Sequence, residues 1–266
     1  MSSNLPGARI DAAADAWGAA LRRIAAADPH MRQEAAGNGT YMVVTGSPAD
    51  SVNGVFTSAL RPDAGRVERL AARTPGVAES FPGPVSWCVQ VRSDPDGRVR
   101  EVARRHGLTK RAREPFMVRD LRGAPPVPGG AGAVEVRAVT GAEHDLYVRA
   151  LADGFGVPKE IFAPLFTPAV LDAAPDITAY VGEVRGQVVA TAMTILTDGH
   201  VGIFNISTVP GHRGAGHGRR ITEEALARGW AAGARTAYLR SSDMGLRLYR
   251  SLGFDVAEHW TYFTGE

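Results

Sequence analysis

The sequence VGIFNISTVPGHRGAGHGRR, residues 201–220, contains the pattern that decides the fold of this chain. The apolar run from Val201 to Val209 predicts a buried strand, and Pro210 ends it. A glycine-rich turn follows, and a helical pattern opens at Ile221. Backbone N–H groups in such a turn and in the first turn of a helix lack internal partners, and the helix dipole favours negative charge there. The stretch therefore predicts an anion site.

Two common nucleotide-binding patterns fit this site poorly. The phosphate loop of nucleotide hydrolases needs G-K-[ST], but Arg219 follows Gly218 here. The dinucleotide fingerprint needs G-x-G-x-x-G and an acid about 20 residues later. The glycines of this turn follow G-x-G-x-G, and the later position, near Tyr238, carries no acid.

A third pattern fits better. The run V-P-x-x-R-G-x-G-x-G, Val209 to Gly218, resembles the acyl-CoA pyrophosphate loop of the GNAT acetyltransferases. A second segment, LYRSLGF at residues 248–254, resembles the L-Y-x-x-x-G-F segment of the same family and follows in the same order. The alternative for the loop alone is a glycine-rich surface turn.

The resemblance implies a mixed α/β sheet with the GNAT fold, in which acyl-CoA lies where two strands splay apart. It also implies roles for individual residues. Backbone N–H groups near Thr208 and Val209 would bind the pantetheine and the acetyl carbonyl, and Tyr249 would be the general acid for the departing thiolate. Ser242, where many members have asparagine, would donate to the pantetheine or a phosphate. The residues that would hold the pyrophosphate are Arg213, Gly214, Ala215, Gly216, His217 and Gly218.

The general base is unassigned. Family members often carry a glutamate on or near the splayed strand, but residues 201–207 contain no acid. Asn205 can hold a water molecule or orient the substrate, yet it cannot accept a proton as a base. A substrate amine of low pKa is one way round this gap. Phe155 falls in the loop that borders the acceptor site in the family, and it is a candidate substrate contact.

A linker divides the chain. Residues 123–133, GAPPVPGGAGA, contain three prolines, four glycines and no charge. We therefore expect a degenerate GNAT-like N-terminal domain at 1–122 and a catalytic GNAT domain at 134–266. A helix, a glycine and a strand end both halves, with Gly107 matching Gly253, but Ala103 stands where Tyr249 would be. An unrelated α/β domain is the alternative for the front half.

Each half ends on a single strand, whereas a complete GNAT fold closes with a pair. Because an unpaired sheet edge is a liability, we expect the two halves to complete or cover each other's edges. Along the chain, we also expect one broken helix over 159–174 and a polar connection over 30–38.

Composition places the chain among ordinary globular proteins. Hydrophobic residues make up 44% and the formal net charge is +2, which is too small to indicate nucleic-acid binding. The lone Cys88 excludes an intrachain disulfide and predicts a small core residue. The histidines form no metal-ligand spacing, no apolar run could span a bilayer, and the start lacks the pattern of a signal peptide. We expect a cytoplasmic monomer or homodimer without a metal, a membrane or a nucleic-acid partner.

The leading hypothesis is an acetyl-CoA-dependent N-acetyltransferase that acts on a small-molecule or amino-acid-like amine by direct attack on the thioester. Acetyl-CoA would be its co-substrate. The alternative is a non-catalytic acyl-CoA-binding protein, which the missing strand acid favours. O-acyl transfer, or a longer acyl donor, stays open.

Overall fold

The computed structural model describes residues 6–123, 126 and 134–265. Of the linker predicted at 123–133, all but residues 123 and 126 lie outside the described residues. The chain divides into two compact units, each described by itself below. Unit 1 is formed by Met1–Met117, Arg240–Ser242 and Val256–Glu266, and unit 2 by Val118–Leu239 and Asp243–Asp255.

Unit 1 contains a mixed sheet in the strand order β1-β2-β3-β4-β11-β5. From β1 to β11 the pairs are antiparallel except for β3 and β4, which are parallel. Asp63 and Asp96 cap the N-termini of helices α2 and α4, and the carboxylate of each accepts two backbone N–H bonds. Its elements are α1 (Gly7–Ala27), β1 (Arg32–Gly37), β2 (Thr40–Val44), β3 (Gly54–Thr57), α2 (Ala64–Ala71), α3 (Thr74–Ala78), β4 (Cys88–Val91), α4 (Gly97–Arg105), most of β5 (Lys110–Asp120) and β11 (Asp255–Thr264).

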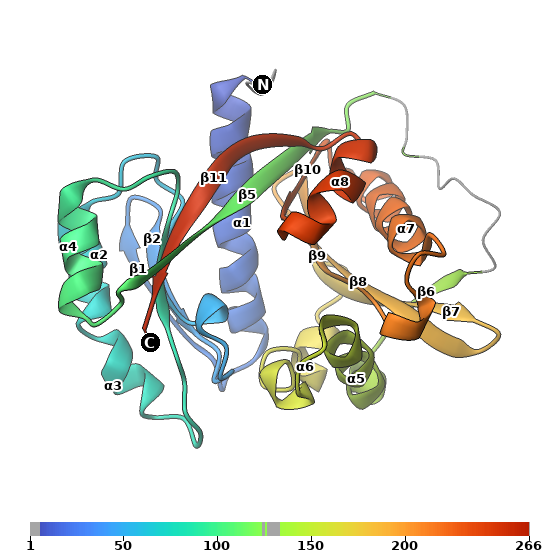
Figure 1. The fold of residues 1–266 in the computed structure, drawn as a ribbon, viewed down its shortest axis with the longest axis horizontal. Helices are drawn as coiled ribbons and strands as arrows, with labels where there is room; N and C mark the ends of the chain where they lie inside the picture. Colours follow the sequence, from blue (N-terminus) through green and yellow to red (C-terminus); the bar gives the residue numbers. More distant parts are fainter. Residues whose placement is uncertain (1–5, 124–125, 127–133, 266) are drawn as a thin grey trace. The chain divides into compact units, whose positions relative to one another are not determined.

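Helices cover both faces of this sheet (Figure 1). Successive side chains of a strand point to opposite faces of the sheet, so each face has its own core. One face packs against α2 and α4 in a buried cluster that includes Met42, Val55 and Val89. On the other face, the Trp17 ring of α1 lies 5.9 Å from Phe56.

The last strand of the chain completes this sheet. β11 pairs antiparallel with β4, with Thr261 opposite Val91 and Thr264 opposite Cys88. A strand from the back half of the sequence thus covers an edge of the front half, as expected for the front sheet. The two units consequently do not follow the predicted boundaries 1–122 and 134–266. The descent of the halves from a repeated domain stays a prediction.

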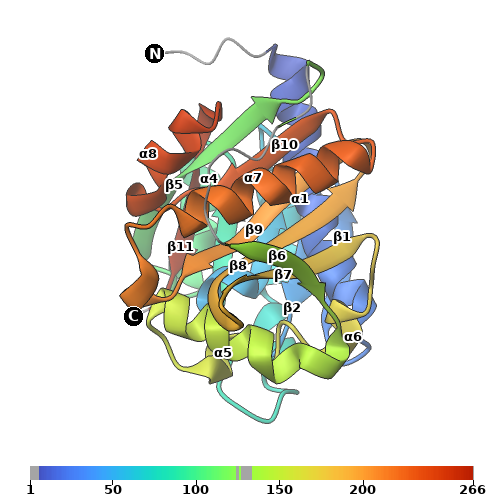
Figure 2. The ribbon, with the colours of Figure 1, turned by 90° about the vertical axis from the view of Figure 1, so that its right-hand side faces the viewer.

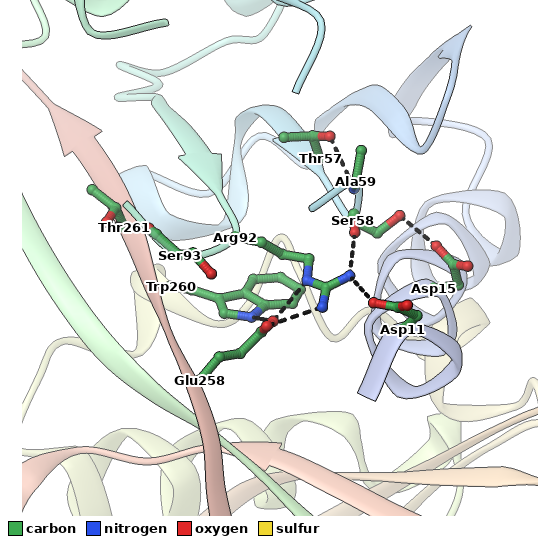
Figure 3. A network of polar contacts seen from close by, with 10 residues as sticks. All are labelled: Asp11, Asp15, Thr57, Ser58, Ala59, Arg92, Ser93, Glu258, Trp260 and Thr261. Carbon is green, nitrogen blue, oxygen red and sulfur yellow. Dashed lines mark hydrogen bonds and ion pairs between the residues drawn. The ribbon is translucent and has the colours of Figure 1, made fainter. Parts of the chain in front are cut away.

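A buried arginine ties β11 to the rest of unit 1 (Figure 3). The Arg92 side chain is 3% exposed. Its Nε and Nη2 donate to the two carboxylate oxygens of Glu258 at 2.7 and 2.9 Å. Its Nη1 donates to Asp11 Oδ1 at 2.9 Å and to the Ser58 carbonyl at 3.0 Å. One guanidinium therefore connects α1, the end of β3, the end of β4 and β11.

Unit 2 is a second mixed sheet in the order β10-β9-β8-β7-β6. β9 and β10 are parallel, and the other pairs are antiparallel. Its elements are β6 (Glu135–Val139), α5 (His144–Phe155), the short helix η3 (Lys159–Ile161), α6 (Pro168–Leu171), β7 (Ile177–Val184), β8 (Gln187–Thr197), β9 (His200–Thr208), α7 (His217–Ala231), most of β10 (Thr236–Arg240) and α8 (Asp243–Ser251).

Helices α7 and α5 pack on β8 and β9 (Figure 2). Each of these helices contacts β9 closely through a glycine. Gly229 of α7 approaches Val201 so closely that a Cβ would lie 2.7 Å from its methyl group. Gly154 of α5 lies directly against Ser207. Val201 and Ser207 are both buried, so α7 covers β9 near its beginning and α5 covers it near its end.

One expectation about local structure was wrong. Residues 32–37 form β1 rather than a connection, although most of its side chains are exposed. Over 159–174 the helix is interrupted, as predicted, and the chain forms the short elements η3 and α6, because Pro164 and Pro168 cannot continue a helix. Cys88 is a fully buried core residue, as predicted. None of the described helices is long and apolar enough to cross a membrane.

The substitution Glu258→Gln tests the buried arginine network. It removes the charge that Arg92 binds with two bonds, so a buried guanidinium loses its main partner. Breaking such a pair costs about 3–5 kcal/mol, and we expect about 3 kcal/mol here because Asp11 remains. Urea unfolding followed by tryptophan fluorescence measures the loss.

Glu101→Gln is the matched control, because Glu101 pairs with Arg104 on the exposed surface of α4. Exposed pairs contribute little, so this variant should unfold like the parent protein. Equal effects of the two substitutions would contradict a special role for Arg92.

Candidate functional site

The edge of β9 that faces β10 is open over most of its length. β9 pairs with β8 from His200 to Thr208. With β10 it pairs only from His200 to Gly202, which lies opposite Tyr238. Among the described residues, no β10 residue pairs with 203–208. The two parallel strands therefore part after three residues, and main-chain groups of β9 become available for a ligand.

A β-bulge accompanies this opening. Between the pairs Thr191–Ser207 and Met193–Phe204, two residues of β9 stand opposite one residue of β8. Asn205 is one of the two, and it has φ +55°. Asparagine is among the few residues other than glycine that tolerate this left-handed region.

Hydrogen bonds hold the bulge in place. Asn205 Nδ2 donates to Tyr147 Oη at 3.0 Å, and Tyr147 Oη donates to the Ala192 carbonyl at 3.3 Å. The Thr191 hydroxyl donates to the Asn205 carbonyl at 2.8 Å. Tyr147 is fully buried, and burial raises the pKa of its phenol, so it remains a neutral donor. Asn205 is thus oriented by a helix on one side and a strand on the other.

The direction of the amides after the bulge decides which of them is available. Val209 N–H donates to the Val189 carbonyl at 3.0 Å, so it belongs to the β8 side. Amides of successive residues in a strand point to opposite sides, which places Thr208 N–H on the open edge. Val209 N–H is thus occupied within the sheet, and ligand binding by Thr208 N–H stays a prediction.

The loop after β9 leads into a helix whose N-terminus has no cap. Gly214 and Gly216 have φ +81° and +84°, which glycine adopts without strain. α7 begins at His217, and its first backbone bond runs from Arg220 N–H to the Gly216 carbonyl at 3.0 Å. No side chain caps this helix, and its first turn contains no acid. The N–H groups of residues 217–219 therefore face an anion site without competition from a cap.

Arg213 braces this loop. Its Nε donates to the Thr208 carbonyl at 3.2 Å, and its Nη2 donates to the Gly154 carbonyl at 2.8 Å. The guanidinium thus joins the end of β9 to the end of α5. Phosphate binding by its remaining donors stays a prediction. Gly214 and Ala215 are exposed in the same loop.

Gly218 is the point at which β9, α7 and α8 meet. A Cβ at this position would lie 3.2 Å from Thr208 Oγ1 and 3.8 Å from Leu248 Cδ2. Arg219 strengthens the junction, since its Nη2 donates to Ser251 Oγ of α8 at 2.5 Å. The two segments singled out in the sequence therefore lie together.

Tyr249, the residue after Leu248, is 8% exposed. Its ring lies 6.0 Å from Phe254, and burial raises the pKa of its hydroxyl to about 12. Within the described part of the chain, this hydroxyl has no hydrogen-bond partner. It is a protonated donor that is available to a ligand.

Phe155 lies beside the end of β9, because the preceding Gly154 packs directly on Ser207. Its side chain is 52% exposed, and its ring lies 5.6 Å from Phe162. Ser242 follows β10 and is exposed. It belongs to unit 1, and its contact with a ligand stays a prediction.

Comparison with known families gives a match for the part of the chain that contains the candidate site. The family model described as "Acetyltransferase (GNAT) domain" matches residues 175–256, which include β9, the loop, α7 and α8. Residues 175–256 are thus similar to GNAT acetyltransferase domains, and the match spans both sequence segments that predicted it. A comparison with curated proteins found no relative.

Solved structures share the GNAT fold over nearly the whole chain. A GCN5-related N-acetyltransferase from Kribbella flavida has a TM-score of 0.68 at 20% identity, covering 96% of this chain and 95% of that one. One from Sphaerobacter thermophilus has a TM-score of 0.58 at 18% identity, covering 88% and 82%. A functionally unknown conserved protein from Staphylococcus epidermidis has a TM-score of 0.62 at 14% identity, covering 88% and 94%. At these identities the likeness shows the fold alone.

The front half lacks the opening found in the GNAT domain. β3 and β4 stay paired over their full lengths, from Gly54 opposite Cys88 to Thr57 opposite Val91. In α4, Ala103 receives the N–H of the residue five positions later, as Tyr249 does in α8. Ala103 and Tyr249 thus occupy equivalent helix-end positions, and only the second carries a phenol.

Two residues of the site escaped the sequence analysis. Tyr147 holds Asn205, but a lone tyrosine on a helix has no pattern that distinguishes this role from core packing. Gly154 could have been noticed, because a glycine inside a helix costs about 1 kcal/mol relative to alanine and indicates a close contact.

Gly154→Ala tests whether α5 must approach β9 this closely. The added Cβ overlaps the Ser207 side chain, so strand or helix must move. Overpacking costs about 1–3 kcal/mol, while alanine returns about 1 kcal/mol of helix propensity. We expect a net loss of about 1 kcal/mol in the free energy of unfolding, measured with urea.

Gly211→Ala is the control in the adjoining loop, because open space surrounds that glycine and its φ is ordinary. It should leave stability unchanged. An increase in stability for Gly154→Ala would show that the close approach is not required.

Proposed function

We propose that the GNAT domain is an acetyl-CoA-dependent N-acetyltransferase that transfers acetyl to the amine of a small molecule. The observation that carries this proposal is the junction at Gly218, where the open edge of β9 meets the uncapped N-terminus of α7 and the helix of Tyr249. An acyl donor with a pyrophosphate at one end and a thioester at the other matches a site of this composition.

The loop residues provide the proposed pyrophosphate site. The first N–H groups of α7 carry the positive end of the helix dipole, and the glycines at 214, 216 and 218 let a phosphate approach the backbone. The first turn contains no acid that would repel it. His212 and His217 flank the loop, with ring centroids 6.2 Å apart.

Acetyl-CoA, when bound, supplies a thioester whose carbonyl carbon the acceptor amine attacks, so that a C–N bond forms and the C–S bond breaks. In the proposed mechanism, Thr208 N–H on the open edge stabilises negative charge on the carbonyl oxygen. Tyr249 donates to the sulfur as it leaves. The amine loses a proton, for which no base is assigned.

The pKa of Tyr249 defines what it can donate. At about 12, its pKa lies above the value of about 8.5 of a cysteine thiol. Complete proton transfer from Tyr249 to a thiolate would therefore be uphill. We assign Tyr249 the role of a hydrogen-bond donor to the developing thiolate, with solvent delivering the final proton.

The surroundings of Phe155 favour an acceptor with an apolar body and a cationic amine. Phe155 and Phe162 offer exposed and half-buried aromatic surface. Asp153 and Glu160 lie close by in sequence, and neither carboxylate has an ionic partner among the described residues. Unpaired acids beside aromatic rings attract an ammonium group.

A non-catalytic acyl-CoA-binding protein is the second candidate. The observation that favours it is the absence of an acid along β9, where Asn205 takes the central position. Both candidates need acetyl-CoA to bind, so only turnover separates them.

Tyr249→Phe separates them. Calorimetry with acetyl-CoA should give similar affinity for the parent protein and the variant. Thiol release with a set of aromatic and aliphatic amines should fall about 10²-fold or more in the variant, because the departing sulfur loses its donor. Since the pKa of Tyr249 is about 12, activity should not decline on its account below about pH 11.

Failure of acetyl-CoA to bind would end both candidates. Binding without turnover on any amine would favour the second. Unchanged turnover in Tyr249→Phe would remove this residue from its role.

His217→Asp tests the pyrophosphate site separately. A carboxylate in the first turn of α7 suits the helix dipole, so the fold should be as stable as before. It should repel the pyrophosphate and weaken acetyl-CoA binding about tenfold or more, which is about 1.4 kcal/mol. His259→Asp is the control, because His259 is an exposed residue of β11. Equal affinities for all three proteins would place the phosphates elsewhere.

A further inference from the structure

A cavity of about 200 Å³ lies in unit 1 between α1 and the β1–β2 hairpin. Its walls include Asp15, Gly18 and Arg22 from α1, and Tyr41 and Ser58 from the sheet. None of its residues belongs to the proposed acetyl-CoA site. Its volume is below the usual range for drug-sized ligands, about 300–1,000 Å³, and suits a molecule of amino-acid size.

Three residues of α1 form one stripe along the cavity. Asp15, Gly18 and Arg22 are spaced i, i+3 and i+7, so they share a helix face. Gly18 lets the Tyr41 ring approach α1, since a Cβ there would lie 3.0 Å from the tyrosine hydroxyl oxygen. A glycine inside a helix costs about 1 kcal/mol, and here it admits the tyrosine that forms the opposite wall of the cavity.

The two charged residues of the stripe, Asp15 and Arg22, form no ion pair within the described chain. Arg22 lies over the Tyr41 ring, 5.6 Å from its centroid, which leaves its N–H donors free of carboxylates. Some other acids and arginines of this unit are paired, as in Arg73 with Glu34. An unpaired anion and an unpaired cation therefore border the same small cavity.

The acid is held in position by the Arg92 network (Figure 3). Ser58 Oγ donates to Asp15 Oδ1 at 2.7 Å, and the Ser58 carbonyl accepts from Arg92. Arg92 in turn is fixed by Glu258. The carboxylate of Asp15 is thus oriented before a ligand arrives, and its second oxygen is available.

We propose that this cavity binds a small amino acid as a zwitterion, with the ammonium group on Asp15 and the carboxylate on Arg22. The planar guanidinium fits a carboxylate with two parallel bonds. The α-carbons of the two residues stand about 10 Å apart along the helix, at 1.5 Å per residue, a span that their side chains and one amino acid fill together. The site does not depend on the proposed transferase activity.

Saturation-transfer NMR and thermal unfolding, without acetyl-CoA, test this site on the full chain. The probes are the twenty common amino acids taken singly at millimolar concentration, with ethylamine and acetate as compounds that carry one charge each. We expect at least one small amino acid to bind, and both single-charge compounds to bind more weakly. Asp15→Asn and Arg22→Gln should each weaken binding about tenfold or more, or about 1.4 kcal/mol.

Arg98→Gln is the matched control, an exposed arginine of α4 outside the cavity; it should bind like the parent protein. Circular dichroism confirms that the variants are folded. The proposal is overturned if no amino acid binds, if binding survives both substitutions, or if acetate or ethylamine binds as well as the amino acid. Acetyl-CoA affinity should be unchanged in all three variants, so failure here is distinguishable from failure of the transferase proposal.

Discussion

The parallel pairing of β9 and β10 ends at Gly202 and Tyr238, and the rest of the proposed site depends on this early end. A fully paired β9 would have no main-chain donor to offer a thioester. The bulge at Asn205 belongs to the same feature, because the extra residue changes which amides face the open edge. In the front half, β3 and β4 remain paired throughout, and that half offers no comparable edge.

Close approach by glycine organises what surrounds the edge. Gly154 lets α5 contact Ser207, and Gly218 lets the start of α7 contact Thr208 and Leu248. Arg213 then joins two of these segments through main-chain carbonyls. Three elements distant in sequence thus converge on the end of β9. Tyr249 comes with them, since it follows Leu248 directly. The packing that buries Tyr249 also keeps its phenol neutral.

Local pattern was sufficient to predict the strand, turn and helix at 201–231 and the tyrosine segment, because glycine positions and apolar runs report directly on backbone geometry. It also predicted that Cys88 is buried. It could not predict β1, whose exposed residues show no apolar alternation. The side on which the Val209 amide lies depends on one extra residue at Asn205, which no periodicity reveals. Nor does any local signal indicate that β11 pairs with β4, because strand exchange is decided by tertiary contacts.

The most direct measurement of this account is the change in backbone amide chemical shifts of the full chain on addition of acetyl-CoA. We expect the largest changes on Thr208 and on residues 216–219, with smaller ones at Val209, whose N–H is bonded to Val189. Large changes confined to β3 and β4, or none at Thr208 and the start of α7, would contradict it.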